Sequence, residues 1–236
     1  MDCNGLFFHQ RNSEIMRVVQ NNNFGETRYG RLAKIYDFLD LLHFGHIGRR
    51  SSNFFLGQLP HVPQNPLIVG CGSGDFAVAY IQSENPNRLT INDLAPGMIE
   101  LTKRRIGRLS WPGKLLVLQG DITQTAATEE YDFIALPYVL NMFSPRARIE
   151  FLKKIKSILK PEGVILVSDF ARPRHPLFLL LHYLIWGLAV LFFWAAAGNK
   201  PNRLGEMPQH FHEAGLSMIQ SKRFLGGLYA AVLLKK

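Results

Sequence analysis

Residues 67–93 read LIVGCGSGDFAVAYIQSENPNRLTIND, and this stretch decides the fold. It begins as a short apolar, β-prone run, passes through Gly70, Gly72 and Gly74, and resumes with apolar residues at helical spacing. Strand, glycine turn and helix in this order are typical of a doubly wound α/β sheet, in which backbone N–H groups and a helix N-terminus face a ligand. Larger side chains at the glycines would block a ligand, so the sequence predicts a binding site at this turn.

Asp93 is the second feature of this stretch, because it ends the next apolar run, RLTIND. A carboxylate at the end of the second strand can accept hydrogen bonds from both hydroxyls of a ribose. The glycine spacing is G-C-G-S-G and not the G-x-G-x-x-G pattern, in which the helix dipole faces a pyrophosphate. The tighter turn favours a ligand without phosphate. Turn and acid together therefore indicate an adenosyl ligand.

The turn and the segment behind it match a known family. Residues 70–74 resemble motif I of the class I S-adenosylmethionine-dependent methyltransferases, and INDLAPGMIELTKRR at 91–105 is similar to the segment that follows motif I. The resemblance implies a Rossmann-like fold, methyltransferase activity and S-adenosylmethionine as the cofactor. It also places Leu94 and Met98 in the cofactor site beside Asp93.

Three further positions correspond to places where the family contacts the cofactor. The end of the third predicted strand resembles the family position where an acid, here Asp121, accepts the adenine amino group and the next residue, Ile122, packs on the ring. An aspartate at a strand end is otherwise a cap for the following turn. Ile68 departs from the family, which carries an acid there, near the methionine amino group. The sequence thus supplies the adenosine half of the site and lacks one anchor for the methionine end.

The whole chain predicts one α/β domain with two additions. We expect a helical cap at 1–65, which ends in a proline-rich linker, and a methyltransferase domain at 66–236. Strand and helix patterns alternate up to Asp169 and predict five parallel strands with four intervening helices. Two more strand patterns around Gly226–Gly227 match the closing antiparallel hairpin of the family. The expected fold is a doubly wound sheet of seven strands.

An apolar stretch at 177–198, LFLLLHYLIWGLAVLFFWAAAG, precedes the hairpin. It is long and apolar enough for a membrane span, yet it joins two strands of one sheet, so both its ends lie on one side of any bilayer. A buried cover helix, an interfacial helix and a re-entrant pair broken near Gly187 are the remaining alternatives. Trp186, Trp194 and flanking basic residues favour the interfacial helix, because such side chains settle at lipid headgroups.

The composition is compatible with that location. The chain has 236 residues with a net charge of +9, which suits an anionic partner such as a membrane surface or a nucleic acid. Cys3 and Cys71 form no disulfide framework, and the first residues lack a secretion signal, so we expect a cytoplasmic protein, peripheral on the inner membrane face. The basic residues fall on two sheet-covering helices, which does not favour nucleic-acid methylation or binding.

The apolar stretch also indicates the substrate, because it lies where methyltransferases of this fold build the substrate pocket and suits a lipophilic small-molecule acceptor. The first half of the domain is similar to the ubiquinone/menaquinone-biosynthesis methyltransferases. The segments at 169–181 and 222–236 look more like the rhodoquinone-biosynthesis protein, a relative that exchanges a methoxy group of ubiquinone for an amino group. We expect methylation of a quinone- or phenol-type acceptor, with rhodoquinone-type amination or a non-catalytic membrane-associated accessory as alternatives.

Methyl transfer to a hydroxyl or an aromatic carbon requires removal of a proton. Tyr138 and Asn141 follow the fourth predicted strand, in the loop that faces the transferable group in this fold, and His175 and His182 lie near the apolar stretch. We predict Tyr138, Asn141 and His175 as catalytic residues, although each can equally be a helix-start or core residue. The sequence has no Cys or His spacing typical of a metal site.

Overall fold

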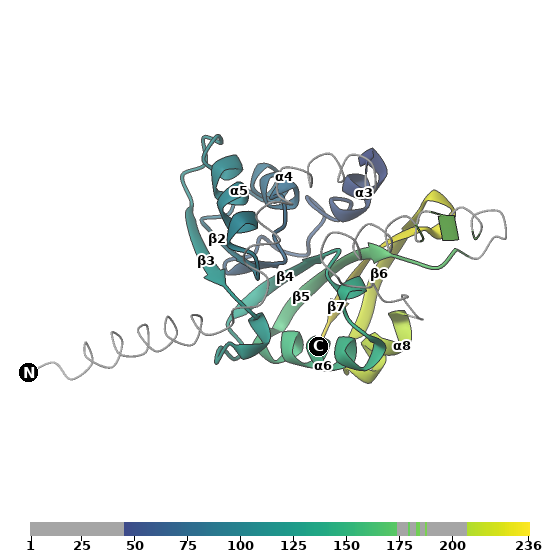
Figure 1. Cartoon of the computed structure of the whole chain (residues 1–236). Helices are drawn as coiled ribbons and strands as arrows, with labels where there is room; N and C mark the ends of the chain where they lie inside the picture. Colours follow the sequence, from purple (N-terminus) through teal and green to yellow (C-terminus); the bar gives the residue numbers. More distant parts are fainter. Residues whose placement is uncertain (1–44, 174–178, 180–182, 185–186, 188–206) are drawn as a thin grey trace, which may run out of the picture.

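The computed structural model describes residues 45–173, 179, 183–184, 187 and 207–236. Most of the predicted cap and of the apolar stretch at 177–198 lies outside these residues, as do His175 and His182. The division into cap and domain therefore stays a prediction. In the described part, a sheet carries helices on both of its faces (Figure 1).

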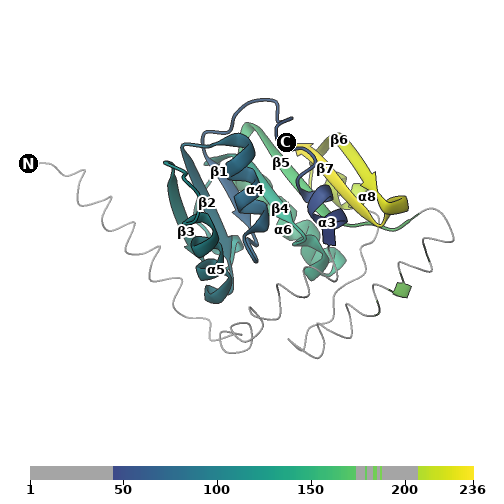
Figure 2. The same ribbon diagram turned by 90° about the horizontal axis from the view of Figure 1, so that it is seen from above.

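The seven-stranded doubly wound sheet with its closing hairpin is confirmed. Its order is β3-β2-β1-β4-β5-β7-β6 (Figure 2). The first five strands are parallel, whereas β7 pairs antiparallel with β5 and with β6. The strands are β1 (Pro66–Val69), β2 (Arg88–Asp93), β3 (Lys114–Gln119), β4 (Tyr131–Pro137), β5 (Leu159–Phe170), β6 (Ser217–Phe224) and β7 (Tyr229–Lys235).

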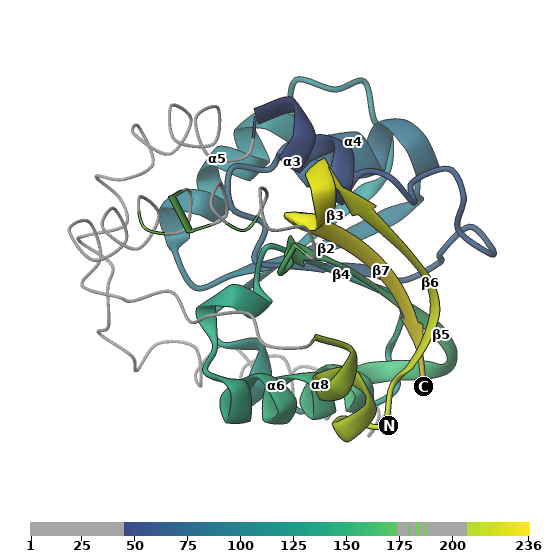
Figure 3. The same ribbon diagram turned by 90° about the vertical axis from the view of Figure 1, so that its right-hand side faces the viewer.

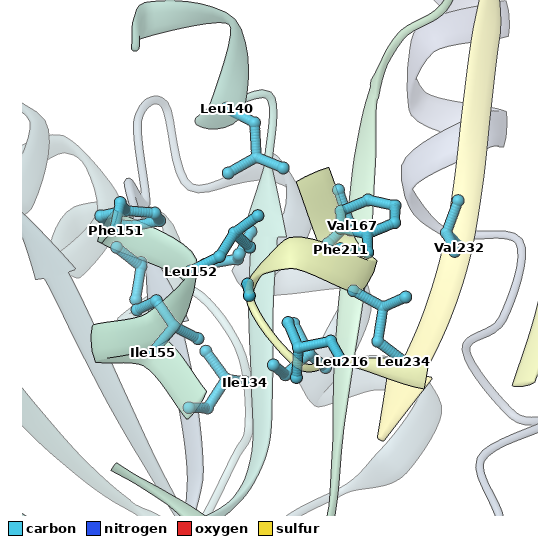
Figure 4. Packing of buried hydrophobic residues seen from close by; sticks show 14 of the residues in the cluster. Ile134, Leu140, Phe151, Leu152, Ile155, Val167, Phe211, Leu216, Val232 and Leu234 are labelled. Carbon is cyan, nitrogen blue, oxygen red and sulfur yellow. The ribbon is translucent and has the colours of Figure 1, made fainter. Parts of the chain in front are cut away.

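Apolar side chains cover both faces of the central strands, as expected for parallel strands buried between helices. On one face, α6 (Pro145–Ile158) and α8 (Met207–Glu213) pack Leu152 and Phe211 against strand residues such as Ile134 and Val167 (Figure 4). On the other face, α4 (Asp75–Glu84) and α5 (Pro96–Ile106) cover a second cluster that includes Ile68. Figure 3 shows the two helical layers with the sheet between them.

Three details differ from the sequence prediction. The β3–β4 connection contains the 3-10 turn η2 (Ile122–Gln124) and no α-helix, so the prediction of four intervening helices is wrong. The connection offers Ile122 as its one large apolar side chain, which is too little to bury a helix face. The sequence pattern predicts the fifth strand at Val164 to Asp169, whereas β5 begins at Leu159, because Leu159 pairs with Tyr131. The short helix α8 was not predicted.

The first described helix, α3 (Gly45–Ser52), packs over β5, β6 and β7 on the same face as α4. It lies within the predicted cap at 1–65 and near the carboxyl end of β5 (Figure 1). Among the residues that the structure describes, no helix has the length and apolarity needed to cross a bilayer.

Candidate active site

The predicted site residues lie where the strand order reverses direction. β1 is the first strand of the described residues, and its neighbours in the sheet are β2 on one side and β4 on the other. In open α/β sheets, ligands bind at such a reversal of strand order, beyond the carboxyl ends of the strands. The predicted residues at 70–74, 93–94, 121–122 and 138–141 all follow or end one of these strands. The fold thus brings together residues that are far apart in the sequence.

The glycine turn follows β1 directly, and all three glycines have a left-handed backbone, with φ of 68°, 51° and 88° at Gly70, Gly72 and Gly74. A Cβ on Gly70 would lie 2.6 Å from Val139 Cγ2, and a Cβ on Gly74 would lie 2.9 Å from the Cα of Thr102. A Cβ on Gly72 would meet no heavy atom closer than 4.0 Å. Gly70 and Gly74 are therefore required for packing within the protein, whereas Gly72 borders open space in which a ligand can lie.

Asp93 ends β2 and lies against the glycine turn. Its Oδ2 accepts a hydrogen bond from the backbone N–H of Gly72 at 2.9 Å, and its Oδ1 accepts one from Ala95 at 3.0 Å. Burial raises the pKa of Asp93, and these backbone hydrogen bonds oppose the rise. Each carboxylate oxygen has a second lone pair with which it can accept a ribose hydroxyl. The two features that the sequence predicted to act together are thus adjacent.

Cys71 lies inside the turn and is buried. Burial and the nearby charge of Asp93 raise the pKa of the Cys71 thiol to about 12. The hydroxyl of Thr102, on α5, lies 3.4 Å from Cys71 Sγ and donates to the Gly72 carbonyl oxygen at 3.1 Å. Cys71 is therefore a neutral, apolar part of the turn, and Thr102 connects the turn to α5.

The remaining predicted cofactor residues differ in how they are placed. Leu94 is 71 % exposed beside Asp93, whereas Met98 is buried on the first turns of α5. Asp121 caps η2, since its Oδ1 accepts hydrogen bonds from the backbone and the side chain of Thr123. Ile122 is buried in the core cluster beneath α6. Exposed Leu94 and the carboxylate of Asp121 are available to a ligand. The cofactor-binding role of Leu94, Met98, Asp121 and Ile122 stays a prediction.

Tyr138 follows β4 with a left-handed backbone, at a φ of 58°. Its hydroxyl lies 2.6 Å from Ser51 Oγ and donates to the carbonyl oxygen of Gly48 at 2.9 Å, so it holds α3 against the sheet. Its ring packs edge-on against Phe170 and Tyr229, with centroid distances of 5.6 Å and 6.3 Å. The hydroxyl of Tyr138 is therefore engaged with the helix that the prediction assigned to the cap.

Asn141 is buried and lies beside a carboxylate that the sequence analysis missed, Asp169. Asn141 Nδ2 donates to Asp169 Oδ1 and to the Tyr138 carbonyl oxygen, both at 2.9 Å. The signal in the sequence was a lone acid near the end of an apolar strand pattern, VILVSDF, but neighbouring strands had to be aligned before its partner was visible. Predicted His175 lies outside the described residues.

The family's glycine motif carries an acid where this chain has Ile68, and the burial of this position accounts for an apolar side chain there. Ile68 is fully buried in the cluster beneath α4 and α5. The nearest acid after the turn is Asp75, at the start of α4, whose carboxylate forms ion pairs with Arg105 of α5 and Arg49 of α3. Within the described part of the chain, no three His, Cys, Asp or Glu side chains gather where they could hold a metal ion.

This arrangement has known relatives. A family model described as a methyltransferase domain matches residues 67–163, from β1 into β5. The chain is also 27 % identical over 174 residues to the ubiquinone/menaquinone biosynthesis C-methyltransferase of Geotalea daltonii, an alignment that covers 72 % of each chain. These matches support a class I S-adenosylmethionine-dependent methyltransferase. S-adenosylmethionine is accordingly its cofactor, and Gly72 and Asp93 fit that molecule, because one leaves space for it and the other can accept its ribose hydroxyls.

Other relatives of this methyltransferase differ in their substrates. It is 28 % identical over 148 residues to the malonyl-acyl-carrier-protein O-methyltransferase of Anoxybacillus flavithermus, and the match spans 52 % of that protein's length. Its fold resembles that of the mitomycin 7-O-methyltransferase MmcR, with a TM-score of 0.64 and 16 % identity over 95 % of this chain and 66 % of that chain. It also resembles NcsB1 from neocarzinostatin biosynthesis, solved with S-adenosylmethionine, with a TM-score of 0.61 and 17 % identity over 86 % of this chain and 56 % of that chain. These structural likenesses concern the fold alone.

Proposed function

We propose that this methyltransferase methylates a lipophilic quinone- or phenol-type acceptor at a membrane surface. The observation that carries the proposal is the similarity to the ubiquinone/menaquinone biosynthesis C-methyltransferase, which covers 72 % of each chain. The aromatic side chains of Tyr138, Phe170 and Tyr229 support it, because they cluster at the carboxyl ends of β4 and β5 and the start of β7. Planar rings of this kind suit a planar, apolar acceptor.

Different residues bind the cofactor and orient the acceptor. When bound, S-adenosylmethionine supplies an electrophilic methyl group. The glycine turn and Asp93 hold its nucleoside, and Leu94 and Asp121 border the adenine. Both N–H groups of Asn141 Nδ2 are engaged, so its Oδ1 is the amide atom that orients a proton-bearing group of the acceptor. Alignment of acceptor and methyl group provides much of the rate enhancement.

We assign Tyr138 a positioning role, since its hydroxyl already donates to Gly48 and contacts Ser51. His175, outside the described residues, remains the proposed base of the three predicted catalytic residues. A base within hydrogen-bonding distance of the acceptor contributes about 10²–10⁴-fold to the rate. A His175→Ala variant that retains full activity on a phenol would remove it from this role.

Membrane contact is supported by the few described residues of the apolar stretch. Tyr183 is 48 % exposed and Leu184 is 63 % exposed. Arg172, just before that stretch, is also exposed, and its carbonyl oxygen accepts a hydrogen bond from the exposed Arg223 at 3.2 Å. Apolar and basic side chains of this kind suit a surface of anionic lipids, on which the protein lies peripherally at the inner membrane face.

The chemical class of the acceptor is tested by incubating purified protein in detergent with methyl-labelled S-adenosylmethionine and a panel of quinols, phenols and malonyl thioesters. Transfer of label to the quinols or phenols supports the proposal, whereas transfer to the malonyl thioesters alone refutes it. Mass analysis of quinones from a ubiquinone-producing host separates the chemistries: a gain of one methylene indicates methylation, and exchange of methoxy for amino indicates rhodoquinone-type amination.

Membrane binding by the protein is tested by co-sedimentation with vesicles of phosphatidylcholine, with and without phosphatidylglycerol. We expect binding to the anionic vesicles and weaker binding after Leu184→Asp. Met218→Asp is the matched control, because Met218 is 51 % exposed at the start of β6 and lies outside the apolar stretch. Equal binding of both variants and the wild type would argue against contact through Leu184.

A further inference from the structure

Asp169 is a carboxylate with no exposed surface, at the end of β5. Its Oδ1 accepts hydrogen bonds from Asn141 Nδ2 at 2.9 Å and from the backbone N–H of Phe170 at 2.7 Å, and its Oδ2 accepts one from the backbone N–H of Asn141 at 3.0 Å. Removing a charge from water is costly, and an apolar residue would pack here without that cost. Core packing alone therefore does not account for an acid at this position.

The bonds of Asp169 fix the loop 138–141, which follows β4 and includes the start of η3 (Leu140–Met142). Asn141 is held through both its side chain and its backbone, and it donates in turn to the Tyr138 carbonyl oxygen. The backbone N–H of Tyr138 donates to the carbonyl oxygen of Ser168 at 2.7 Å. These contacts hold Tyr138 in its left-handed conformation, which costs a non-glycine residue on the order of 1 kcal/mol.

The same loop reaches the glycine turn through Val139. A Cβ on Gly70 would lie only 2.6 Å from Val139 Cγ2, so the valine methyl lies directly against the first glycine. A series of contacts therefore connects Asp169 to Asn141, Asn141 to the loop 138–141, and Val139 to Gly70. Release of Asn141 would let Val139 move and would loosen the turn that approaches the cofactor.

A second buried side chain supports the loop from α6. Arg148 has no exposed surface, and its guanidinium donates to the carbonyl oxygens of Leu140 at 3.0 Å and Phe143 at 2.9 Å. His210 of α8 lies beside it, with 3.3 Å between His210 Nδ1 and Arg148 Nη1. The positive charge of Arg148 also favours the charged form of Asp169. Asp169 of β5 and Arg148 of α6 thus hold the same turn from two sides.

We propose that Asp169 is a positioning residue for cofactor binding, which acts through Asn141 and Val139 on the glycine turn. The proposal rests on the cofactor site proposed at Gly72 and Asp93. It assigns a task to a residue whose hydrogen bonds go to Asn141 and Phe170, and it makes the loop 138–141 part of the cofactor site.

The test is a double-mutant cycle on Asp169→Asn and Val139→Ala, read as the Kd of S-adenosylhomocysteine by calorimetry. Asparagine offers one carbonyl oxygen to three N–H donors, so we expect Kd to rise about tenfold, with about a fivefold rise for Val139→Ala. If Asp169 acts through Val139, the double variant binds no more weakly than Asp169→Asn alone. Effects that multiply, or an unchanged Kd for Asp169→Asn, would overturn the proposal.

Asp132→Asn is the matched control. Asp132 is buried at the opposite end of β4 and also accepts hydrogen bonds from backbone N–H groups, those of Gln64 and Asn65, each at 2.9 Å. This variant removes an equivalent charge and we expect an unchanged Kd. If Asp169→Asn does not fold, a cycle on Asn141→Ala and Val139→Ala tests the same coupling with the same two outcomes. Failure of the cofactor site itself is distinguishable, because Asp93→Asn would then bind normally.

Discussion

The carboxylate of Asp93 accepts a hydrogen bond from the backbone N–H of Gly72 at 2.9 Å, and this contact joins the ends of β1 and β2. The acid therefore has two tasks, because it shapes the glycine turn and is the proposed acceptor of the ribose hydroxyls. A residue that holds its loop while it binds the ligand leaves little to rearrange when the cofactor arrives.

Asp93→Asn should weaken S-adenosylhomocysteine binding about 100-fold, since it removes charge-assisted hydrogen bonds to the ribose and replaces one acceptor oxygen by a donor. Calorimetry measures the Kd. Asp121→Asn is the comparison, and we expect a smaller loss, of about tenfold, because one oxygen of Asp121 already caps η2. A Kd of wild-type magnitude for Asp93→Asn would show that the ribose is bound elsewhere.

Gly72→Ala should chiefly lower cofactor affinity, whereas Gly74→Ala should chiefly lower the stability of the fold. Gly72 borders open space, so its variant loses about 1 kcal/mol of stability from a φ of 51° and loses cofactor affinity through the added methyl group. In Gly74→Ala the Cβ would lie 2.8 Å from Thr102 Oγ1, so we expect a loss of about 2–3 kcal/mol in the free energy of unfolding. Chemical denaturation and calorimetry on both variants measure the two quantities, and equal losses of stability would contradict this distinction.

Tyr138→Phe separates positioning from proton transfer. Loss of the hydroxyl should reduce the free energy of unfolding by about 1 kcal/mol, because the hydrogen bonds to α3 are lost. Ser51→Ala removes one of the same contacts from the other side and should have a similar effect. A decrease in kcat of more than about 100-fold in Tyr138→Phe, with normal kcat in Ser51→Ala, would instead identify Tyr138 as the base.

Cofactor affinity should depend on the protonation of Asp169. Burial raises the pKa of Asp169 to about 6, against hydrogen bonds from Asn141 and Phe170 and the charge of Arg148. His210 lies beside Arg148, Tyr138 and Tyr229 lie on the neighbouring elements, and the residue paired with Asp169 on β7 is Ala230. Protonation places a hydrogen on an oxygen that faces N–H donors, so Kd should rise as the pH falls through 6, and Asp169→Asn should lack this step.

The contribution of Asp169 to the free energy of unfolding should decrease as the pH rises, whereas cofactor affinity should increase. The pKa of Asp169 in the folded protein lies above its ordinary value of 3.8, so its contribution to the free energy of unfolding is fully present below that value and is lost as the pH rises through about 6. Thermal unfolding of the wild type and of Asp169→Asn between pH 5 and about 7 isolates this contribution. Weaker binding at pH 5 that accompanies a lower Tm specific to the wild type would point to unfolding, and not to movement of the loop.

The sequence predicts the sheet, and it predicts the glycine turn together with the acid that lies beside it, because these features depend on local patterns. Apolar runs bounded by glycine mark the strands, and the turn at 70–74 carries its own geometry. The Asp169–Asn141 pair was missed because it joins two strand ends that lie 28 residues apart in the chain. The helix α8 was missed because seven residues are too few to show a helical period.

The position of β7 has a consequence for how the protein forms. This strand is the last of the seven to be synthesised, yet it lies inside the sheet, paired with β5 on one side and β6 on the other. While β7 is still within the ribosome, β5 has an exposed edge and β6 has no partner, so the nascent chain carries an open sheet that can recruit other strands. Assembly of the native sheet must therefore wait until β7 has left the ribosome.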